Sequence, residues 1–523
     1  MSPSSRREPG AGGRRASGLL LHVTSLPGSA ACGTLGREAE AFASFLAASG
    51  QSYWQVLPLG PVCAHWNFSP YSSPSTFAGN EMLVDAEALV AEGWLDAGER
   101  RAAGNGPAGD FCDLDAAASA SSACLEAACR RFFASAGDAA GEAFARFCAE
   151  QKAWLEDYAL FRALADRFAT FQWTSWPEDI ARREPAAVGR WREELRAAVQ
   201  RRRFEQFVFF GQWRALKRFA NRNGVRLIGD IPFYVNFESA DAWSRPDIFQ
   251  VDERTGRPAY VAGVPPDYFS ASGQRWGNPL YRWQHGGVLH EPTLEWWRER
   301  IRHLLQMVDV LRIDHFRGFD SYWAIPEGEP TAIRGQWRPG PGMAFFDRLR
   351  RTLGDLPLVA EDLGEITPDV EELRERLGFP GMKILQFAFD GSGANPYLPH
   401  NFPNANCLVY TGTHDNNTSN GWFYGAETDE ARKRFILEYM GLDHRDEFHW
   451  HFIRLAMQSV ARLALFPVQD ILGYDGRFRM NTPGKAAGNW TWRLTPGALT
   501  PEIGRRLRRL TELANRLPTT GLS

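Results

Sequence analysis

Short apolar runs separated by amphipathic stretches dominate the pattern of hydrophobic and polar positions. Most of the intervening stretches have helical periodicity, as in 296–308 and 367–377. The runs are bounded by Gly, Pro or Asp, which is typical of buried strands. They cover residues 18–23, 52–59, 225–233, 308–314, 356–362, 382–389, 407–413 and 463–470. Eight repeats of strand and helix predict an α/β fold, a parallel sheet closed into a (β/α)8 TIM barrel.

An open, doubly wound sheet with extra strands is the alternative to the barrel. Two observations favour the barrel. The number of strand-like runs is eight, and no G-x-G-x-x-G sequence follows any early run.

Two long segments interrupt the alternation. Residues 85–205 are rich in Ala, Arg and Glu and contain no strand-like run, which predicts a helical insertion at the C-terminal face of the barrel. Residues 235–300 carry many Pro, Gly and aromatic residues, which indicates a loop-rich insertion that covers a substrate. We therefore expect a catalytic barrel over 18–523, interrupted by both insertions and preceded by a disordered tail over 1–17.

Composition narrows the class of protein. Of 523 residues, 44% are hydrophobic, and the net charge is −3, which excludes a disordered chain and argues against a nucleic-acid or polybasic membrane binder. The seven cysteines include no C-x-x-C, so a disulfide framework or zinc site is not expected. No run is long enough to span a membrane, and the N-terminus lacks the apolar stretch of a secretory signal. We expect a cytoplasmic protein, and its 19 tryptophans favour stacking surfaces for flat or sugar-like ligands.

Polar residues follow three of the predicted strands. The fourth run ends at Arg312 and Asp314, the fifth at Glu361, and the seventh at His414 and Asp415. Because the strands of a (β/α)8 barrel end at the catalytic face, these side chains are expected to meet in one cup. Three carboxylates with an Arg and a His, and no Cys/His metal cluster, suit glycosyl transfer through an oxocarbenium-like transition state.

Each group suits one part of that chemistry. Arg312 precedes Asp314 by two positions, so both face the same side of the strand, and the cation keeps a nucleophilic carboxylate ionised. Glu361 would retain a proton because neighbouring carboxylates and burial raise its pKa. Asp415 can accept hydrogen bonds from sugar hydroxyls, and His414 can donate one. Taken singly, a carboxylate after a strand is more often a helix cap. Three carboxylates at strand ends of one barrel favour a catalytic role over a structural one.

Several longer strings narrow the interpretation further. They are SPYSSPSTFAGN (69–80), GDIPFYV (229–235), PPDYFSASGQRWGNPLY (265–281), LRIDHFRGF (311–319), AEDLG (360–364), YTGTHDNNT (410–418) and GNW (488–490). On these strings the chain resembles the 4-α-glucanotransferases called amylomaltases or disproportionating enzymes, which belong to the α-amylase clan. The resemblance extends from about residue 18 to 515. It is carried by the long GQRWGNPLY string and AEDLG in particular.

The resemblance implies a double displacement. Asp314 is then the nucleophile, Glu361 the acid/base and Asp415 the transition-state stabiliser. The expected substrate-binding residues are Tyr71, Asp230, Asp267, Gln274, Trp276, Arg312 and His414. Among these, Tyr71 matches an aromatic residue that stacks on the sugar, and Asp230 either touches substrate or holds Arg312.

The resemblance also implies the substrates and the reaction. The substrates are α-1,4-glucans, namely maltose, maltooligosaccharides and fragments of starch or glycogen, and a segment moves to the 4-hydroxyl of an acceptor. The carboxylates alone do not distinguish this from an α-amylase-type retaining hydrolase. A catalytically dead carbohydrate-binding barrel is a third interpretation, which the complete carboxylate set argues against. No nucleotide, flavin or pyridoxal motif occurs, so no cofactor is expected. The chemistry needs no metal ion. Whether the protein binds a structural calcium ion is left open by the sequence.

Overall fold

A computed structural model describes residues 14–28, 30–104, 106, 109–135, 137–252, 254–266 and 270–518. Its centre is an eight-stranded sheet in which all neighbouring strands are parallel, in the order β11-β8-β3-β2-β1-β14-β13-β12. The strands are β1 (Ala16–Leu20), β2 (Tyr53–Gln55), β3 (Arg226–Ile231), β8 (Val310–Ile313), β11 (Leu358–Ala360), β12 (Gly381–Ile384), β13 (Cys407–Tyr410) and β14 (Leu463–Pro467). A backbone hydrogen bond of 3.0 Å from Ala360 N to Pro380 O joins the two edges. The predicted (β/α)8 barrel is confirmed.

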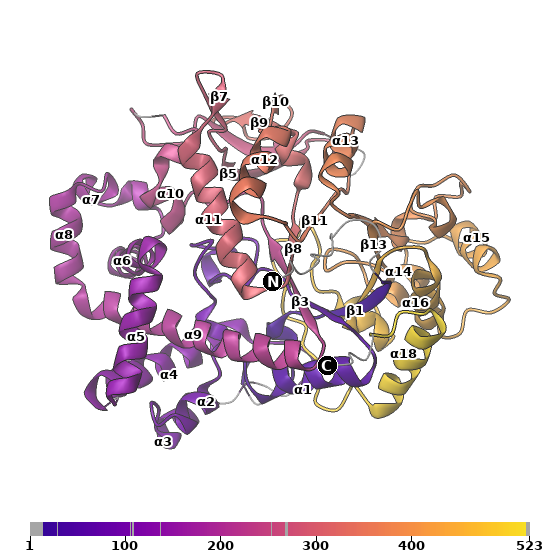
Figure 1. Cartoon of the computed structure of the whole chain (residues 1–523), viewed down its shortest axis with the longest axis horizontal. Coiled ribbons are helices and arrows are strands. Elements are labelled where there is room, and N and C mark those ends of the chain that lie inside the picture. The colour runs from indigo at the N-terminus through magenta and orange to yellow at the C-terminus, as the bar shows by residue number, and fades with distance from the viewer. Residues whose placement is uncertain are drawn as a thin grey trace, which may run out of the picture.

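Each predicted run overlaps one strand of the barrel. The barrel interior is filled by a separate cluster of buried side chains from alternating strand positions, because the other side chains pack outward against helices. This interior cluster is Ile228, Val359, Met382, Ile384, Leu408, Tyr410, Leu463 and Leu465. Outer helices include α1 (Arg37–Ala48), α11 (Glu291–Met307), α12 (Gly342–Leu353), α13 (Pro368–Leu377), α16 (Phe448–Gln458) and α18 (Pro501–Leu513), which surround the sheet in Figure 1.

The chain between β2 and β3 forms a group of helices beside the barrel, coloured purple in Figure 1. They are α2 (Ala86–Ala91), α3 (Ala97–Ala102), α4 (Leu114–Ser135), α5 (Asp138–Glu150), α6 (Lys152–Phe168), α7 (Glu178–Ala181), α8 (Pro185–Glu194) and α9 (Arg196–Arg222). The long helix α9 returns the chain to the barrel and leads directly into β3.

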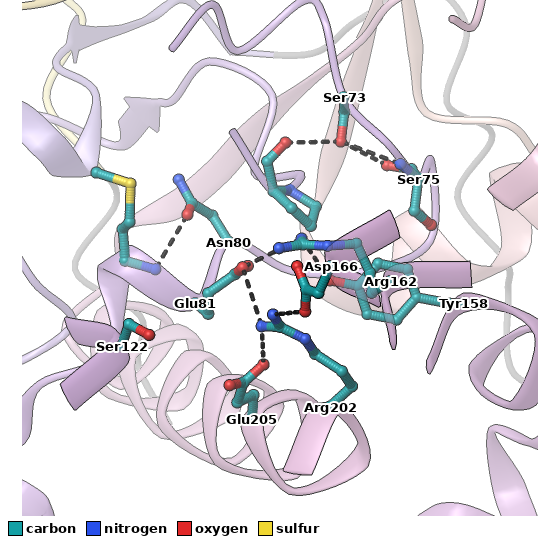
Figure 2. Close-up of polar contacts among 12 residues, drawn as sticks. Ser73, Ser75, Asn80, Glu81, Ser122, Tyr158, Arg162, Asp166, Arg202 and Glu205 are labelled. Carbon is teal, nitrogen blue, oxygen red and sulfur yellow. Dashed lines mark hydrogen bonds and ion pairs between the residues drawn. The ribbon is translucent and has the colours of Figure 1, made fainter. Parts of the chain in front are cut away.

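A cluster of charged side chains joins these helices to the segment that follows β2. Figure 2 shows Glu81 facing the guanidinium groups of Arg162 on α6 and Arg202 on α9. Arg162 Nη1 lies 3.2 Å from Glu81 Oε1. Arg202 also pairs with Asp166 at 2.6 Å and Glu205 at 2.8 Å. The cluster fixes α6 and α9 relative to the chain near the mouth of the barrel.

We expect Glu81→Gln to lower the free energy of unfolding by about 2–3 kcal/mol, because it leaves a largely buried guanidinium without its carboxylate. The side chain of Arg162 is only 9% exposed. Urea unfolding of both proteins measures the difference. The matched control is Glu178→Gln, whose partner Arg182 is 66% exposed, and there we expect a change below about 0.5 kcal/mol. Equal changes in the two variants would contradict the prediction.

The segment over 235–300, expected to be irregular, also contains regular structure. It holds α10 (Ala240–Ser244), β4 (Tyr260–Val264) and β5 (Gln274–Pro279), and α11 begins within it. With β9 (Ser321–Pro326) and β10 (Gln336–Pro339), β4 and β5 form a four-stranded antiparallel sheet in the order β10-β9-β4-β5. The expectation missed this sheet because its partner strands come from beyond residue 300 and because a bulge between Val261 and Gly263 breaks the alternation.

The expected extent of the N-terminal tail is corrected by the structure. β1 begins at Ala16, so the expected disordered tail over 1–17 is too long by at least two residues, and the remainder of it up to residue 13 lies outside the described residues. All seven cysteines lie in the described residues and are unpaired. Among the described residues, no helix is both long and apolar enough to cross a membrane.

Candidate active site

A cavity of about 660 Å³ opens where the barrel strands end. Five of the side chains predicted from sequence line it, and they come from elements far apart in the chain. They are Tyr71, Trp276, Asp314, His414 and Asp415. The strand ends therefore meet in one cup, as the barrel topology predicts.

Arg312 on β8 is held between two carboxylates. Its Nη1 donates to Asp230 Oδ1 at 2.8 Å and Oδ2 at 2.6 Å, and its Nη2 lies 3.1 Å from Asp314 Oδ1. The side chain of Asp230 has 0% exposure. Asp230 therefore holds Arg312, which is one of the two roles expected for it.

Asp314 faces the cavity with 31% of its side chain exposed. Burial of the surrounding site raises the pKa of Asp314 to about 8, with Glu361, Asp230 and Asp415 adding to the rise and Arg312 opposing it. Water in the open cavity and the guanidinium 3.1 Å away both favour the ionised form. The raised pKa and the ion pair thus act in opposite directions on the same carboxyl group.

Glu361 follows β11 and is turned onto the backbone. Its Oε2 accepts from His315 N at 2.6 Å and its Oε1 from Leu363 N at 2.9 Å. Burial raises the pKa of Glu361, opposed by Arg312 and by these two amides. Glu361 is not among the side chains that line the cavity.

Asp415 is the most exposed of the three carboxylates, with 45% of its side chain open. Asn481 Nδ2 donates to its Oδ1 at 2.6 Å, and His414 Nε2 lies 3.3 Å from its Oδ2. Arg479 Nη2 donates to the backbone oxygen of Asp415 at 2.5 Å. The residues Arg479 and Asn481 were not predicted. Both residues lie in a loop after β14, and no apolar run in the sequence indicates where this loop is placed. The only sequence signal for them was their polarity close to the turn residues Pro483 and Gly484.

Aromatic rings form one wall of the cavity. The Tyr71 ring stacks on His414 with centroids 5.1 Å apart at 10°, and Trp490 lies 5.9 Å from Tyr71. The Tyr71 hydroxyl donates to Asp230 Oδ2 at 2.7 Å, which ties the ring to the Arg312 cluster. Trp490 has a φ of 66°, a strained value for a large side chain. It was missed as a site residue although it lies in the GNW string.

The predicted covering segment contributes Trp276 and Gln274 from β5. Trp276 is 39% exposed and meets His315 edge-on at 4.9 Å. Its Nε1 donates to Gln274 Oε1 at 3.1 Å, so Gln274 supports the indole and is itself absent from the described lining of the cavity. The other residue predicted here, Asp267, lies outside the described residues.

A (β/α)8 barrel with two carboxylates in an aromatic-lined cavity at its C-terminal face, and a third on the neighbouring strand end, belongs to the class of enzymes that act on glycosidic bonds. A family model described as 4-α-glucanotransferase matches residues 21–500. The chain belongs to this family, so the expected resemblance is confirmed, and the hydrolase alternative is not favoured.

Individual relatives are similar to this chain over nearly its whole length. A 4-α-glucanotransferase of Thermus thermophilus is 47% identical over 96% of this chain and 99% of that protein. A 4-α-glucanotransferase of Synechocystis is 46% identical over 96% of this chain and 98% of that protein. The solved structure of an amylomaltase from Streptococcus agalactiae in complex with acarbose has a TM-score of 0.92, with 37% identity over 97% of this chain and 100% of that one.

Proposed function

We propose that this enzyme transfers a segment of an α-1,4-glucan from a donor maltooligosaccharide to the 4-hydroxyl of an acceptor glucan or glucose. The observation that carries the proposal is the clamped Arg312–Asp314 pair facing a cup that also holds Asp415 and aromatic rings. The acarbose complex of the Streptococcus relative supports an oligosaccharide ligand.

Asp314 acts as the nucleophile in this proposal. Its carboxylate attacks the anomeric carbon, the glycosidic bond breaks, and a covalent glucosyl-enzyme forms. Arg312 holds the attacking carboxylate in place and opposes the rise of its pKa, which favours the ionised form, and Asp230 holds Arg312.

Glu361 acts as the acid/base. It gives its proton to the leaving-group oxygen and then takes one from the acceptor 4-hydroxyl. Burial favours the protonated form of Glu361 by raising its pKa. The two backbone amides at His315 and Leu363 hold the carboxyl group in a resting orientation, which substrate binding has to exchange for a contact with the sugar.

Asp415 stabilises the charged sugar ring. Asn481 fixes its Oδ1, and the exposed carboxylate stands ready to accept hydrogen bonds from sugar hydroxyls. His414, held flat against Tyr71, adds a donor beside it. Tyr71, Trp490 and Trp276 offer ring faces to which sugars bind.

Transfer, in place of hydrolysis, requires that an acceptor sugar reach the intermediate more readily than water does. Positioning of an acceptor hydroxyl is worth up to about 7–11 kcal/mol of the activation barrier. We propose that the exposed Trp276 supplies an apolar face for the acceptor and excludes water from it.

We expect Trp276→Ala to raise the ratio of hydrolysis to transfer by about tenfold, since the loss of one sugar-stacking face costs about 1–2 kcal/mol of acceptor binding. The ratio is measured from the glucose and longer maltodextrins formed from maltotriose. Trp337→Ala is the control, because Trp337 is similarly exposed at 37% but is absent from the lining of the cavity. An unchanged ratio in Trp276→Ala contradicts a role of this ring in the acceptor site.

Incubation of the purified protein with maltotriose tests the proposed function directly. A ladder of longer maltodextrins together with free glucose is the expected result. Maltose and glucose without longer chains would show a hydrolase, and no reaction with any α-glucan would support the interpretation as a binding protein.

The setting of the enzyme is also proposed. The reaction takes place in the cytoplasm, without a nucleic-acid or membrane partner. It needs no cofactor, because the covalent intermediate conserves the energy of the broken α-1,4 bond. We propose that the helices within 85–205 and the segment 235–300 are insertions into one catalytic barrel. The second one covers the substrate.

A further inference from the structure

Another cavity lies at the opposite end of the barrel. Its volume is about 450 Å³, and residues at or just before the starts of β1, β2, β3 and β8 line it together with the chain after α18. We call it the basal cavity. Its charged side chains are four arginines, Arg14, Arg15, Arg226 and Arg516, and a single carboxylate, Asp309. The lining therefore carries a large excess of positive charge.

The one carboxylate is already engaged. Asp309 Oδ2 accepts from Asn221 Nδ2 at 2.9 Å and from Leu227 N at 2.8 Å, and Lys217 Nζ lies 3.5 Å from Oδ1. Within the described part of the chain, none of the four arginines forms a salt bridge. Asp309 thus offsets the neighbouring lysine and leaves the four guanidinium groups uncompensated.

Two of the arginines are held by backbone oxygens alone. Arg516 is fully buried and donates to Met457 O at 2.8 Å, Ala16 O at 2.8 Å and Ser459 O at 3.1 Å. Arg15 donates to the same oxygens of Met457 and Ser459, at 2.6 and 2.7 Å. These oxygens end helix α16, whose dipole provides about half a negative charge against two full positive charges.

The surroundings of Arg516 disfavour its positive charge. Burial and the adjacent Arg15 lower the pKa of Arg516 to about 9. Arg15 Nε is also buried without a hydrogen-bond partner among the described residues. Capping of α16 accounts for the position of these two side chains but leaves excess positive charge beneath the cavity.

The other two arginines have no such structural role. Arg14 and Arg226 are exposed, and neither side chain donates a hydrogen bond to a described residue. Arg226 is the first residue of β3, and its backbone N–H bonds to Ser52 O, so its place is fixed while its guanidinium stays available. Tyr53, the first residue of β2, adds a ring beside them.

We propose that the basal cavity binds a phosphate group, either as inorganic phosphate or as the phosphate ester of a sugar. Guanidinium forks donate paired hydrogen bonds to tetrahedral oxyanions, and buried positive charge strengthens them. The cavity volume exceeds that of a phosphate ion, which leaves room for a sugar against Tyr53. The site lies at the face opposite the carboxylates, so the bound anion stabilises the barrel and takes no part in the transfer reaction.

Calorimetric titration of the full-length protein tests this, with inorganic phosphate, glucose 1-phosphate and glucose as probes. We expect saturable binding of phosphate with a Kd of about 1 mM or below. Tighter binding of glucose 1-phosphate than of phosphate identifies an ester site, and equal affinity identifies the phosphate group alone. Chloride at matched ionic strength is the control for screening. No saturable binding of either phosphate probe, or an equal response to chloride, overturns the proposal.

Variants assign the binding to the cavity. We expect R226Q to raise the Kd for phosphate by about tenfold, because one charge-assisted fork is lost. R14Q, at the other exposed arginine, is expected to act similarly, and neither change removes a contact seen in the fold. R146Q on α5 removes an equally exposed charge and leaves the Kd unchanged. Maltotriose turnover stays the same in R226Q. Unchanged phosphate affinity in both R226Q and R14Q contradicts the site, whatever the outcome of the transferase test.

Discussion

Asp314→Asn is expected to lower the turnover of maltotriose by at least about 1,000-fold, because an amide oxygen is too weak a nucleophile to form the glucosyl-enzyme. Asn keeps the shape of the side chain and an oxygen for Arg312, whose Nη2 lies 3.1 Å from Asp314 Oδ1. Glucose release over time measures turnover. Asp347→Asn, an exposed substitution on α12, is the matched control and keeps full activity.

The same variant separates loss of chemistry from loss of fold. The pKa of Asp314 is raised to about 8 in the folded protein, whereas a free Asp titrates near 3.9. Its contribution to stability is therefore fully present below the free value and is lost as the pH rises through about 8. Asn cannot ionise, so the variant gains stability relative to the parent as the pH increases across this window. Melting curves from about pH 4 to pH 9 test this. A variant that unfolds more readily at every pH, or retains substantial activity, contradicts the assignment.

The barrel and the convergence of its strand ends could be predicted from sequence. Parallel strands buried on both faces appear as continuous apolar runs, and three of these runs are followed by polar residues at the same end of the barrel. Asp314, His414 and Asp415 therefore stood out. The roles given to them by family resemblance remain proposals.

Long-range pairing was not visible in the sequence. The antiparallel sheet of β4, β5, β9 and β10 forms between segments whose alternation is short and broken. Asp470, which ends the eighth predicted run, is buried and accepts hydrogen bonds from Thr411 and Ser419, which lie more than 50 residues before it in the chain. Asn481 and Trp490 reach the cavity from a loop, and a loop's position is set by tertiary packing alone.

Glu361→Gln is expected to reduce transfer from maltotriose by about 1,000-fold, since the leaving sugar then departs without a proton. A donor whose leaving group needs no proton separates this role from a structural one. With α-maltosyl fluoride, Asp314 attacks the anomeric carbon and fluoride departs as an anion. Formation of the covalent intermediate is then retained within about tenfold.

The second half-reaction gives the sharper result. The amide that replaces the Glu361 carboxylate cannot take the proton of the acceptor hydroxyl, so the glycosyl-enzyme formed from the fluoride accumulates, and intact-mass spectrometry shows one added maltosyl group. In the parent enzyme, activity falls as the pH rises through the raised pKa of Glu361, because the acid loses its proton. With the fluoride donor, the variant lacks that alkaline decline in the rate of adduct formation. Glu365→Gln, an exposed change four residues away, is the control and turns over normally. Absence of the adduct, or the same alkaline decline in the variant, would assign the acid/base role to another residue.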